Sequence, residues 1–193
     1  YTITDAELLW DITRRLAERM NQAGVEVFLS RPEAMIPTDP ERAEIANAFN
    51  ADLLISLRLD RHPNPRGNGV ATFYFGNSLG AESMLGEALS GFIQREIVAR
   101  TPLTDCHYHG RTWDIVRLTR MPTVQIDIGY TTNPHDAAVL AVCDDLAEQL
   151  VAILRDGTEV ELPEDLQEDM SASGVFSRQV IDPDGHQWEF MAA

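Results

Sequence analysis

The sequence predicts a single α/β domain in three layers, with a mostly parallel or mixed central sheet and helices on both faces. Two observations predict this class. Segments with apolar residues at helical spacing alternate along the chain with short β-branched runs. One run, ADLLISL at residues 51–57, is almost entirely apolar, as expected for a strand buried on both faces. The length of 193 residues suits about one domain.

The first part of the chain predicts helix, strand, helix and strand in turn. The first helix begins at Thr4 or Asp5, which can cap it, and ends at Gly24, a residue type favoured after helix C-termini. Residues 25–30 alternate and include β-branched valines, which predicts a strand. The next helix begins at Thr38, with a proline in the tolerated first turn, and leads into the apolar strand.

The second part continues this alternation. Residues 61–69 are rich in proline, glycine and asparagine and predict a loop. The predicted elements that follow are a strand at 70–75, a helix from Leu85 to Ile97, strands at 115–118 and 123–128, and a helix at 144–154.

The composition changes after the last predicted helix. Residues 159–169 are acidic, and residues 171–174 are small and polar. We therefore expect residues 1–155 to form the domain and residues 156–193 to form a loosely attached tail with a docking or regulatory role. Within this tail, DPDGHQWEF at 182–190 is similar to the last strand of glyoxalase-type metal proteins, but it more simply predicts a turn followed by an aromatic strand.

The charge composition excludes several classes of function. The chain has 15 basic and 31 acidic residues, a formal net charge of −16 and no lysine. Nucleic acids and anionic membranes require basic surfaces, so neither is an expected partner. Without lysine there is no P-loop or Schiff-base chemistry. Two cysteines without metal-binding spacing, Cys106 and Cys143, and the lack of an apolar run of about 18 residues favour a reducing compartment without membrane insertion.

The histidines offer only weak alternatives for a metal site. His107 and His109 are two residues apart and would face the same side of a strand, but they lack a third ligand. His62 lies in a flexible loop, from which it could reach the end of the preceding strand. His135 is expected at a helix start, and His186 lies in the tail.

Four segments follow one another in an order typical of one family. They are DAELLW at 5–10, VFLSR at 27–31, ERAEIAN followed by ADLLISLR within 41–58, and MPTVQIDIGYTTNP at 121–134. Together they resemble the zinc-dependent N-acetylmuramoyl-L-alanine amidases, which cleave the bond between muramic acid and the stem peptide of peptidoglycan. The likeness extends over residues 1–155, and it implies the zinc-amidase fold, lacking its first strand in this chain.

The chain departs from that family at three functional positions. Arg58 stands where the family has a zinc-binding histidine, Asp5 where it has a glutamate ligand, and Asp127 where it has a catalytic glutamate. The remaining histidine ligand lies in a glycine-rich turn that would precede Tyr1. A guanidinium has no usable lone pair and stays charged, so we expect zinc to be absent and catalysis to be lost. We expect Arg58 to occupy the former metal site and to pair with Asp127, with Asp5 as a further partner.

Further motifs resemble a degenerate actinobacterial branch of the family. They are DCHYHGRTWD at 105–114, RLTRMPTVQ at 117–125 and IGYTTNPHD at 128–136. The resemblance implies a cytoplasmic protein that does not cleave peptidoglycan. It implies instead that the protein binds and stimulates the UDP-N-acetylglucosamine enolpyruvyl transferase of peptidoglycan precursor synthesis, under the control of a Ser/Thr kinase that acts on the tail.

Two sets of residues are candidates for these contacts. Arg111, Arg117 and Arg120 surround Trp113, and arginine and tryptophan are favoured at protein interfaces, although surface arginines on a strand pair are the plainer interpretation. The tail offers phosphate acceptors, which are Ser171, Ser173 and Ser177. Two alternatives remain open, which are an active zinc amidase with unexpected ligands and a glycan-binding module that keeps the old groove without chemistry.

Overall fold

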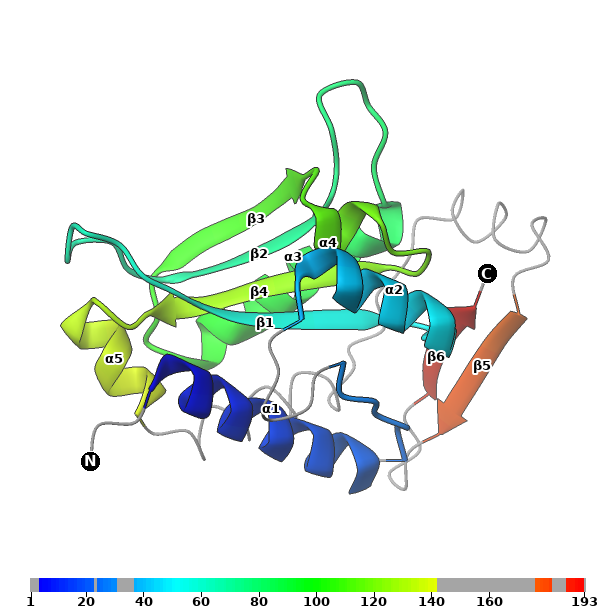
Figure 1. Ribbon diagram of the computed structural model, residues 1–193, viewed down its shortest axis with the longest axis horizontal. Helices are drawn as coiled ribbons and strands as arrows, with labels where there is room; N and C mark the ends of the chain where they lie inside the picture. The colour runs from blue at the N-terminus through cyan, green and yellow to red at the C-terminus, as the bar shows by residue number, and fades with distance from the viewer. Residues whose placement is uncertain (1–3, 23, 31–36, 142–175, 182–186, 193) are drawn as a thin grey trace.

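A four-stranded mixed sheet forms the centre of the molecule (Figure 1). The computed structural model describes residues 4–22, 24–30, 37–141, 176–181 and 187–192. The strands lie in the order β1 (Leu54–Asp60), β4 (Thr123–Tyr130), β2 (Val70–Phe75) and β3 (Asp105–Arg111). β1 and β4 are parallel, β2 and β3 are parallel, and β2 and β4 are antiparallel. The carboxyl ends of β1 and β4 therefore lie at one end of the sheet, and those of β2 and β3 lie at the other.

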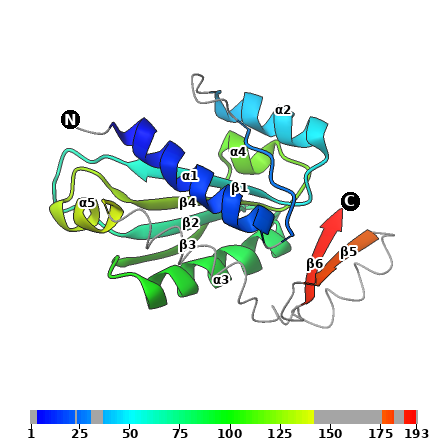
Figure 2. The ribbon, with the colours of Figure 1, turned by 90° about the horizontal axis from the view of Figure 1, so that it is seen from below.

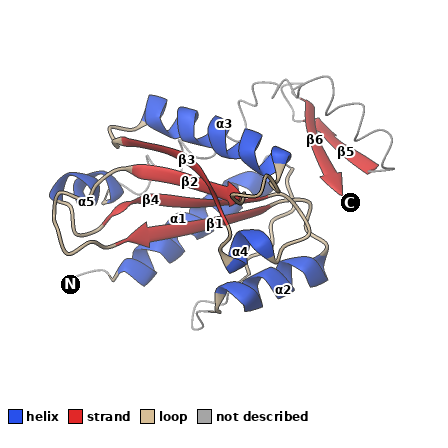
Figure 3. Cartoon of the chain, turned by 90° about the horizontal axis from the view of Figure 1, so that it is seen from above, coloured by secondary structure: helices blue, strands red, loops and turns tan. Residues whose placement is uncertain are grey.

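Helices cover both faces of this sheet, which confirms the predicted α/β class. α3 (Met84–Arg100) lies on one side, and α2 (Asp39–Phe49) and α4 (Asp114–Arg117) lie on the other (Figures 2 and 3). α1 (Asp5–Gln22) and α5 (Pro134–Leu140) share the core with α3.

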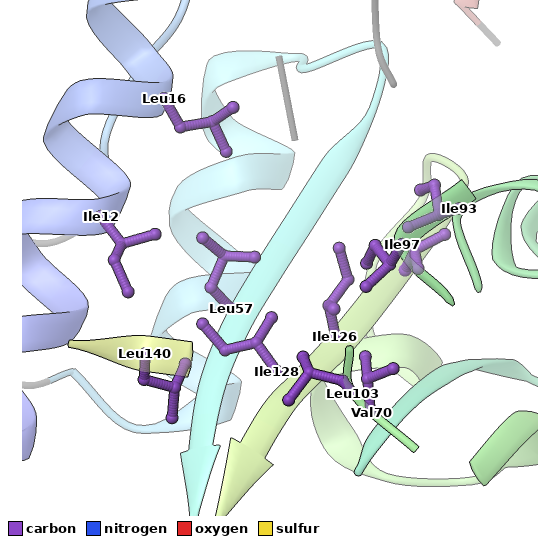
Figure 4. Close-up of a cluster of buried hydrophobic side chains, with 11 residues drawn as sticks. Ile12, Leu16, Leu57, Val70, Ile93, Ile97, Leu103, Ile126, Ile128 and Leu140 are labelled. Atoms are coloured by element: carbon purple, nitrogen blue, oxygen red, sulfur yellow. The ribbon is translucent and has the colours of Figure 1, made fainter. Parts of the chain in front are cut away.

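The core lies between the sheet and the helices α1, α3 and α5. Its side chains alternate with residues that face α2 and α4, because successive strand residues point to opposite faces. The labelled members of this cluster in Figure 4 are Ile12, Leu16, Leu57, Val70, Ile93, Ile97, Leu103, Ile126, Ile128 and Leu140. Burial of so many branched aliphatic side chains, at roughly 1.5–3 kcal/mol each, is the main stabilising contribution to this layer.

The helix starts follow the capping residues that the sequence predicts. The Thr4 hydroxyl accepts a hydrogen bond from the Glu7 N–H, and the Glu7 carboxylate accepts one from the Thr4 N–H, which is a capping box at the start of α1. Thr38 and Glu41 form the same motif at the start of α2. Gly24 has a φ of +87°, a conformation that glycine adopts without strain, and it follows the end of α1.

Two predicted strands are wrong. Residues 25–29 are outside the regular helices and strands and are not paired in the sheet, because local alternation does not supply a neighbouring strand. Residues 115–118 lie in and just after α4, in which the Trp113 carbonyl accepts hydrogen bonds from the Val116 and Arg117 N–H groups. The strand predicted at 51–57 begins and ends three residues before β1 does, and the strand predicted at 123–128 begins with β4 but ends two residues early. The strand predicted at 70–75 coincides with β2.

The structure adds β3 and, in the predicted tail, a strand at 176–181, and it confirms the aromatic strand predicted after the DPDG turn. β3 contains both histidines of the 107–109 pair. β5 (Phe176–Ile181) and β6 (Gln187–Ala192) form an antiparallel pair within the predicted tail, on either side of the predicted turn. The predicted helix at 144–154 lies outside the described residues.

Candidate functional site

The sequence-predicted site residues Arg58 and Asp127 lie side by side on adjacent parallel strands. Arg58 of β1 is the Cα register partner of Asp127 of β4. Both residues lie in the carboxyl-terminal half of their strands, which is the end where parallel sheets carry their functional groups. Arg58 is exposed and Asp127 is partly buried. The sheet therefore places the Arg58 cation on the strand next to the Asp127 carboxylate.

Burial and neighbouring charges compete over the protonation of Asp127. Burial raises the pKa of Asp127 to about 6, with a smaller contribution from the Asp60 carboxylate. The positive charge of Arg58 and a hydrogen bond from Gln125 act in the opposite direction and lower this pKa. The Gln125 Nε2 donates to Asp127 Oδ1 at 3.0 Å. The carboxylate is therefore held by a neutral amide on its own strand and is only partly compensated by Arg58.

Asp5 takes a different partner from the one that the sequence predicts. Its Oδ2 accepts a hydrogen bond from the Thr131 hydroxyl at 3.1 Å and lies 3.3 Å from the Arg61 Nε. Arg58 makes no hydrogen bond or ion pair with any residue that the structure describes, so its interaction with Asp127 is a longer-range attraction. The expected pairing of Arg58 with Asp5 is thus wrong, because the Arg61 side chain reaches Asp5 from the loop after β1.

These residues do not fit a zinc ion. Among the described residues no three His, Cys, Asp or Glu side chains are grouped as a metal site. Arg58 and Arg61 offer no lone pair to a metal, and the Asp5 carboxylate already forms an ion pair with Arg61. His62 follows in the same loop, but its Nδ1 accepts a hydrogen bond from the Asn64 N–H at 3.0 Å. The arrangement can bind carboxylates or hold a proton, and it lacks the imidazoles that a zinc site uses.

The histidine pair of β3 does not form a metal site either. His107 has a φ of +63° at a register shift between β2 and β3, so the two histidines do not share a face as regular alternation would predict. The His107 Nδ1 lies 3.2 Å from Asp105 Oδ2. The His109 ring contacts Phe73, and its Nε2 is 2.8 Å from the Cys106 carbonyl oxygen. His135 lies in the first turn of α5, as the sequence predicts, where its N–H donates to the Asn133 side chain.

The predicted partner surface lies at the opposite end of the sheet, where β2 and β3 finish. The Arg111 guanidinium lies 5.4 Å from the centroid of the Phe73 ring and 5.8 Å from that of Trp113, and these two rings are 4.7 Å apart. Arg117 instead forms an ion pair with Asp114 at 2.6 Å. Arg120 lies beyond α4 and lines a hollow against α2. The structure therefore joins Arg111 to Trp113 and separates the other two arginines from them.

Of the three candidate phosphate acceptors, only Ser177 belongs to the described residues. It lies in β5 as the register partner of Met191. Ser171 and Ser173 lie outside the described residues.

The sequence analysis did not identify three residues that shape the site around Asp5, Arg58 and Asp127 and the contact between α2 and α4. Gln125 is fully buried and holds Asp127, Arg61 pairs with Asp5, and Asn47 joins α2 to the segment after α4. A signal existed for Gln125, because it is a polar residue two positions from Asp127 in an otherwise apolar strand and so faces the same side. The contacts of Arg61 and Asn47 depend on tertiary structure and left no pattern in the sequence.

Comparisons with known proteins agree with the fold and with the motifs. The model of the N-acetylmuramoyl-L-alanine amidase family matches residues 1–156. N-acetylmuramoyl-L-alanine amidase CwlM of Mycobacterium tuberculosis is 54% identical over 156 residues, which are 79% of this chain and 38% of CwlM. N-acetylmuramoyl-L-alanine amidase LytC of Bacillus subtilis is 27% identical over 158 residues, which are 81% of this chain and 31% of LytC. The chain thus spans well under half the length of either curated relative.

A solved structure shows the same fold. The N-acetylmuramoyl-L-alanine amidase from Clostridium difficile 630 superposes with a TM-score of 0.68 at 25% sequence identity, over 79% of this chain and 81% of that one. Among the helices that the structure describes, none has the length and apolar character needed to cross a bilayer.

Proposed function

This chain belongs to the N-acetylmuramoyl-L-alanine amidase family, and from that premise we propose that it is a catalytically inactive, cytoplasmic member with a regulatory role. In this role it binds and stimulates the UDP-N-acetylglucosamine enolpyruvyl transferase of peptidoglycan precursor synthesis. A Ser/Thr kinase controls this stimulation by phosphorylating the C-terminal tail. The 54% identity with CwlM confirms the branch of the family that the motifs predicted, and the regulatory role is the expectation that this resemblance carries.

One observation carries the loss of catalysis. Arg58 stands next to Asp127 at the sheet position where the family resemblance implies a zinc-binding histidine. An arginine there removes a ligand and adds a positive charge that would repel the metal. Asp127, in place of the catalytic glutamate, is shorter by one methylene and is held by Gln125. Removal of the metal and retraction of the base act together against hydrolysis.

A second candidate function is an active zinc amidase. CwlM and LytC both carry the name N-acetylmuramoyl-L-alanine amidase, which favours this candidate. This candidate requires zinc to bind with ligands other than Arg58, and it predicts release of stem peptides from peptidoglycan.

Elemental analysis together with a hydrolysis assay separates the two candidates. After equilibration with zinc and removal of excess metal, the protein should contain far less than stoichiometric zinc and should release no stem peptide from purified peptidoglycan. LytC treated in the same way serves as the positive control. Stoichiometric zinc accompanied by hydrolysis would overturn the proposal and establish the enzyme.

The regulatory role needs its own measurement. The initial rate of the purified enolpyruvyl transferase should rise when the protein is added, and it should rise further after treatment of the protein with the Ser/Thr kinase. A variant with Ser171→Ala, Ser173→Ala and Ser177→Ala should bind the transferase but lose the kinase response. An unchanged transferase rate would disprove the regulatory role even if zinc is absent.

A further inference from the structure

A hollow between α2 and the segment that follows α4 contains both a carboxylate and a guanidinium, which do not pair with each other. Its volume is about 370 Å³, and its lining residues are Pro40, Glu44, Asn47, Ala48, Leu118 and Arg120. We propose that this hollow is a binding site for a small zwitterion with an apolar side chain, which is the chemistry of an apolar amino acid or dipeptide. Such binding requires neither the regulatory role proposed above nor the former zinc site.

The two walls of the hollow are held together before any ligand binds. Pro40, Glu44 and Asn47 follow helical spacing and so lie on one face of α2. The Asn47 Nδ2 donates to the Leu118 carbonyl oxygen at 2.9 Å, and the Arg120 N–H donates to the Asn47 Oδ1 at 2.9 Å. A preformed site has a smaller ordering cost on binding. Because both polar atoms of Asn47 are used in this way, the side chains left to recognise a charged ligand are Glu44 and Arg120.

The two charged side chains of the hollow have opposite signs and are both available to a ligand. They form no ion pair with each other, and neither the Glu44 carboxylate nor the Arg120 guanidinium makes a hydrogen bond or ion pair with any other residue that the structure describes. A ligand with a single charge would be attracted by one of these groups and repelled by the other. A zwitterion can direct its ammonium to Glu44 and its carboxylate to Arg120, since a planar guanidinium binds a carboxylate through two parallel hydrogen bonds.

The remaining lining of the hollow is apolar and accounts for the side chain of the ligand. Leu118 is 37% exposed, and Pro40 and Ala48 are exposed on α2, beside which Figures 1 and 3 show α4. An aliphatic side chain placed against these residues would remove apolar surface from water. The hollow is within the size range of ligand pockets, roughly 300–1,000 Å³, which suits a ligand as small as an amino acid or a dipeptide.

The hollow is separate from the former catalytic end of the sheet. The Leu54 N–H at the start of β1 donates to the Pro122 carbonyl oxygen at 3.1 Å, so β1 and β4 both begin beside the segment that contains Arg120. Arg58 and Asp127 lie in the carboxyl-terminal halves of the same two strands. Substitutions in the hollow therefore leave the surroundings of Arg58 and Asp127 unchanged.

Two-dimensional NMR titrations test the site, with leucine and leucyl-leucine as the probes. Binding should shift the signals of the Arg120 backbone N–H and the Asn47 side-chain amide, which lie in the walls of the hollow. N-acetylleucine lacks the ammonium and leucine amide lacks the carboxylate. Each should bind about twofold to fivefold more weakly than leucine, the effect expected for loss of an exposed charge pair. The tighter of the two probes shows whether the hollow takes the amino acid or the dipeptide.

Two variants that each remove one charge should change the order of these affinities. Glu44→Gln removes the partner of the ammonium, so N-acetylleucine should bind this variant at least as tightly as leucine does. Arg120→Gln removes the partner of the carboxylate, so leucine amide should bind that variant at least as tightly as leucine does. Glu26→Gln and Arg66→Gln make the same charge changes at exposed positions outside the hollow and should leave the order unchanged.

Three results would each contradict a zwitterion site in this hollow. The first is the absence of shifts at Asn47 and Arg120 with both probes, and the second is equal binding of leucine and its two blocked analogues. The third is an order of affinities that Glu44→Gln and Arg120→Gln leave unchanged. Neither zinc nor the enolpyruvyl transferase takes part in these titrations, so their failure would leave the proposed function intact, and failure of the proposed function would leave this site intact.

Discussion

The protonation of Asp127 depends on a balance between burial and neighbouring charges. A buried carboxylate favours its neutral form, and a nearby cation favours the charged form. Here burial prevails over Arg58 and the Gln125 hydrogen bond, and the pKa rises from an ordinary 3.8 to about 6. Arg58 is exposed to solvent, which screens its charge and explains why it compensates only in part.

This balance predicts that Asp127 destabilises the folded protein at neutral pH. Between pH 3.8 and about 6 the folded state retains a proton that the unfolded state has released, so stability falls as pH rises through this window. Asp127→Asn should therefore raise the free energy of unfolding by on the order of 2 kcal/mol near pH 8 and by much less near pH 4. Urea unfolding at both pH values measures the difference. Glu26→Gln, at an exposed carboxylate, is the control, and a pH-independent effect of Asp127→Asn would contradict the prediction.

Gly69 precedes β2 at a position that no other residue type can occupy. Its φ is +100°, and an added Cβ would clash with the Thr104 carbonyl oxygen and lie 2.8 Å from the Cys106 Sγ. Its N–H also donates to the buried Asp136 carboxylate at 2.7 Å. Gly69 therefore cannot move away from Thr104 and Cys106 without loss of its hydrogen bond to Asp136 of α5.

Gly69→Ala should consequently lower the free energy of unfolding by more than about 3 kcal/mol, which combines backbone strain with a steric clash. Gly80→Ala is a matched control, because Gly80 has a φ of +85° and open space around its Cα. The control should lose only about 1 kcal/mol. Thermal and urea unfolding of both variants give the comparison, and equal losses would show that strain alone decides the effect.

At the scale of elements, features that depend on neighbouring residues could be predicted from the sequence, and features that depend on a distant segment could not. Helix starts at Thr4 and Thr38 depend on side chains within one turn, and both could be predicted. The segments 25–30 and 115–118 have strand-like composition, but a strand exists only with a hydrogen-bonded neighbour, and this information is tertiary. The His107 bulge in β3 likewise arises from pairing with β2.

The candidate site divides in the same way. Arg58 and Asp127 could be placed together from the sequence, because each belongs to the carboxyl-terminal part of a buried strand. The partner of Asp5 could not be predicted, because Arg61 reaches it from an irregular loop whose path the sequence does not determine. Local patterns therefore located the backbone of the site, and the structure was needed for its ion pair.

The connection between α2 and α4 depends on Asn47 and can be tested alone. Its side chain both donates to the Leu118 carbonyl and accepts from the Arg120 N–H, so Asn47→Ala removes two hydrogen bonds. The expected loss in the free energy of unfolding is about 1–3 kcal/mol, measured by urea unfolding. Asn68→Ala, which loses one exposed loop hydrogen bond, should have a smaller effect. Equal losses for the two variants would show that the bridge contributes no more than an exposed loop hydrogen bond.

At the scale of the whole molecule, the mixed sheet separates two kinds of surface. The end where β1 and β4 finish holds an ion pair between Asp5 and Arg61, and the end where β2 and β3 finish stacks Arg111 on Phe73 and Trp113. Because β2 and β4 are antiparallel, these two groups lie at opposite ends of the sheet.

The net charge of −16 predicts that salt stabilises the folded protein. With 31 acidic and 15 basic residues, repulsion within the compact state exceeds attraction, and salt screens repulsion between exposed charges. The melting temperature should therefore rise between about 10 and about 150 mM NaCl. Calorimetry in matched buffers measures it, and KCl in place of NaCl controls for specific ion effects. A melting temperature that falls with salt would mean that ion pairs such as Arg15 with Asp11 outweigh the net repulsion.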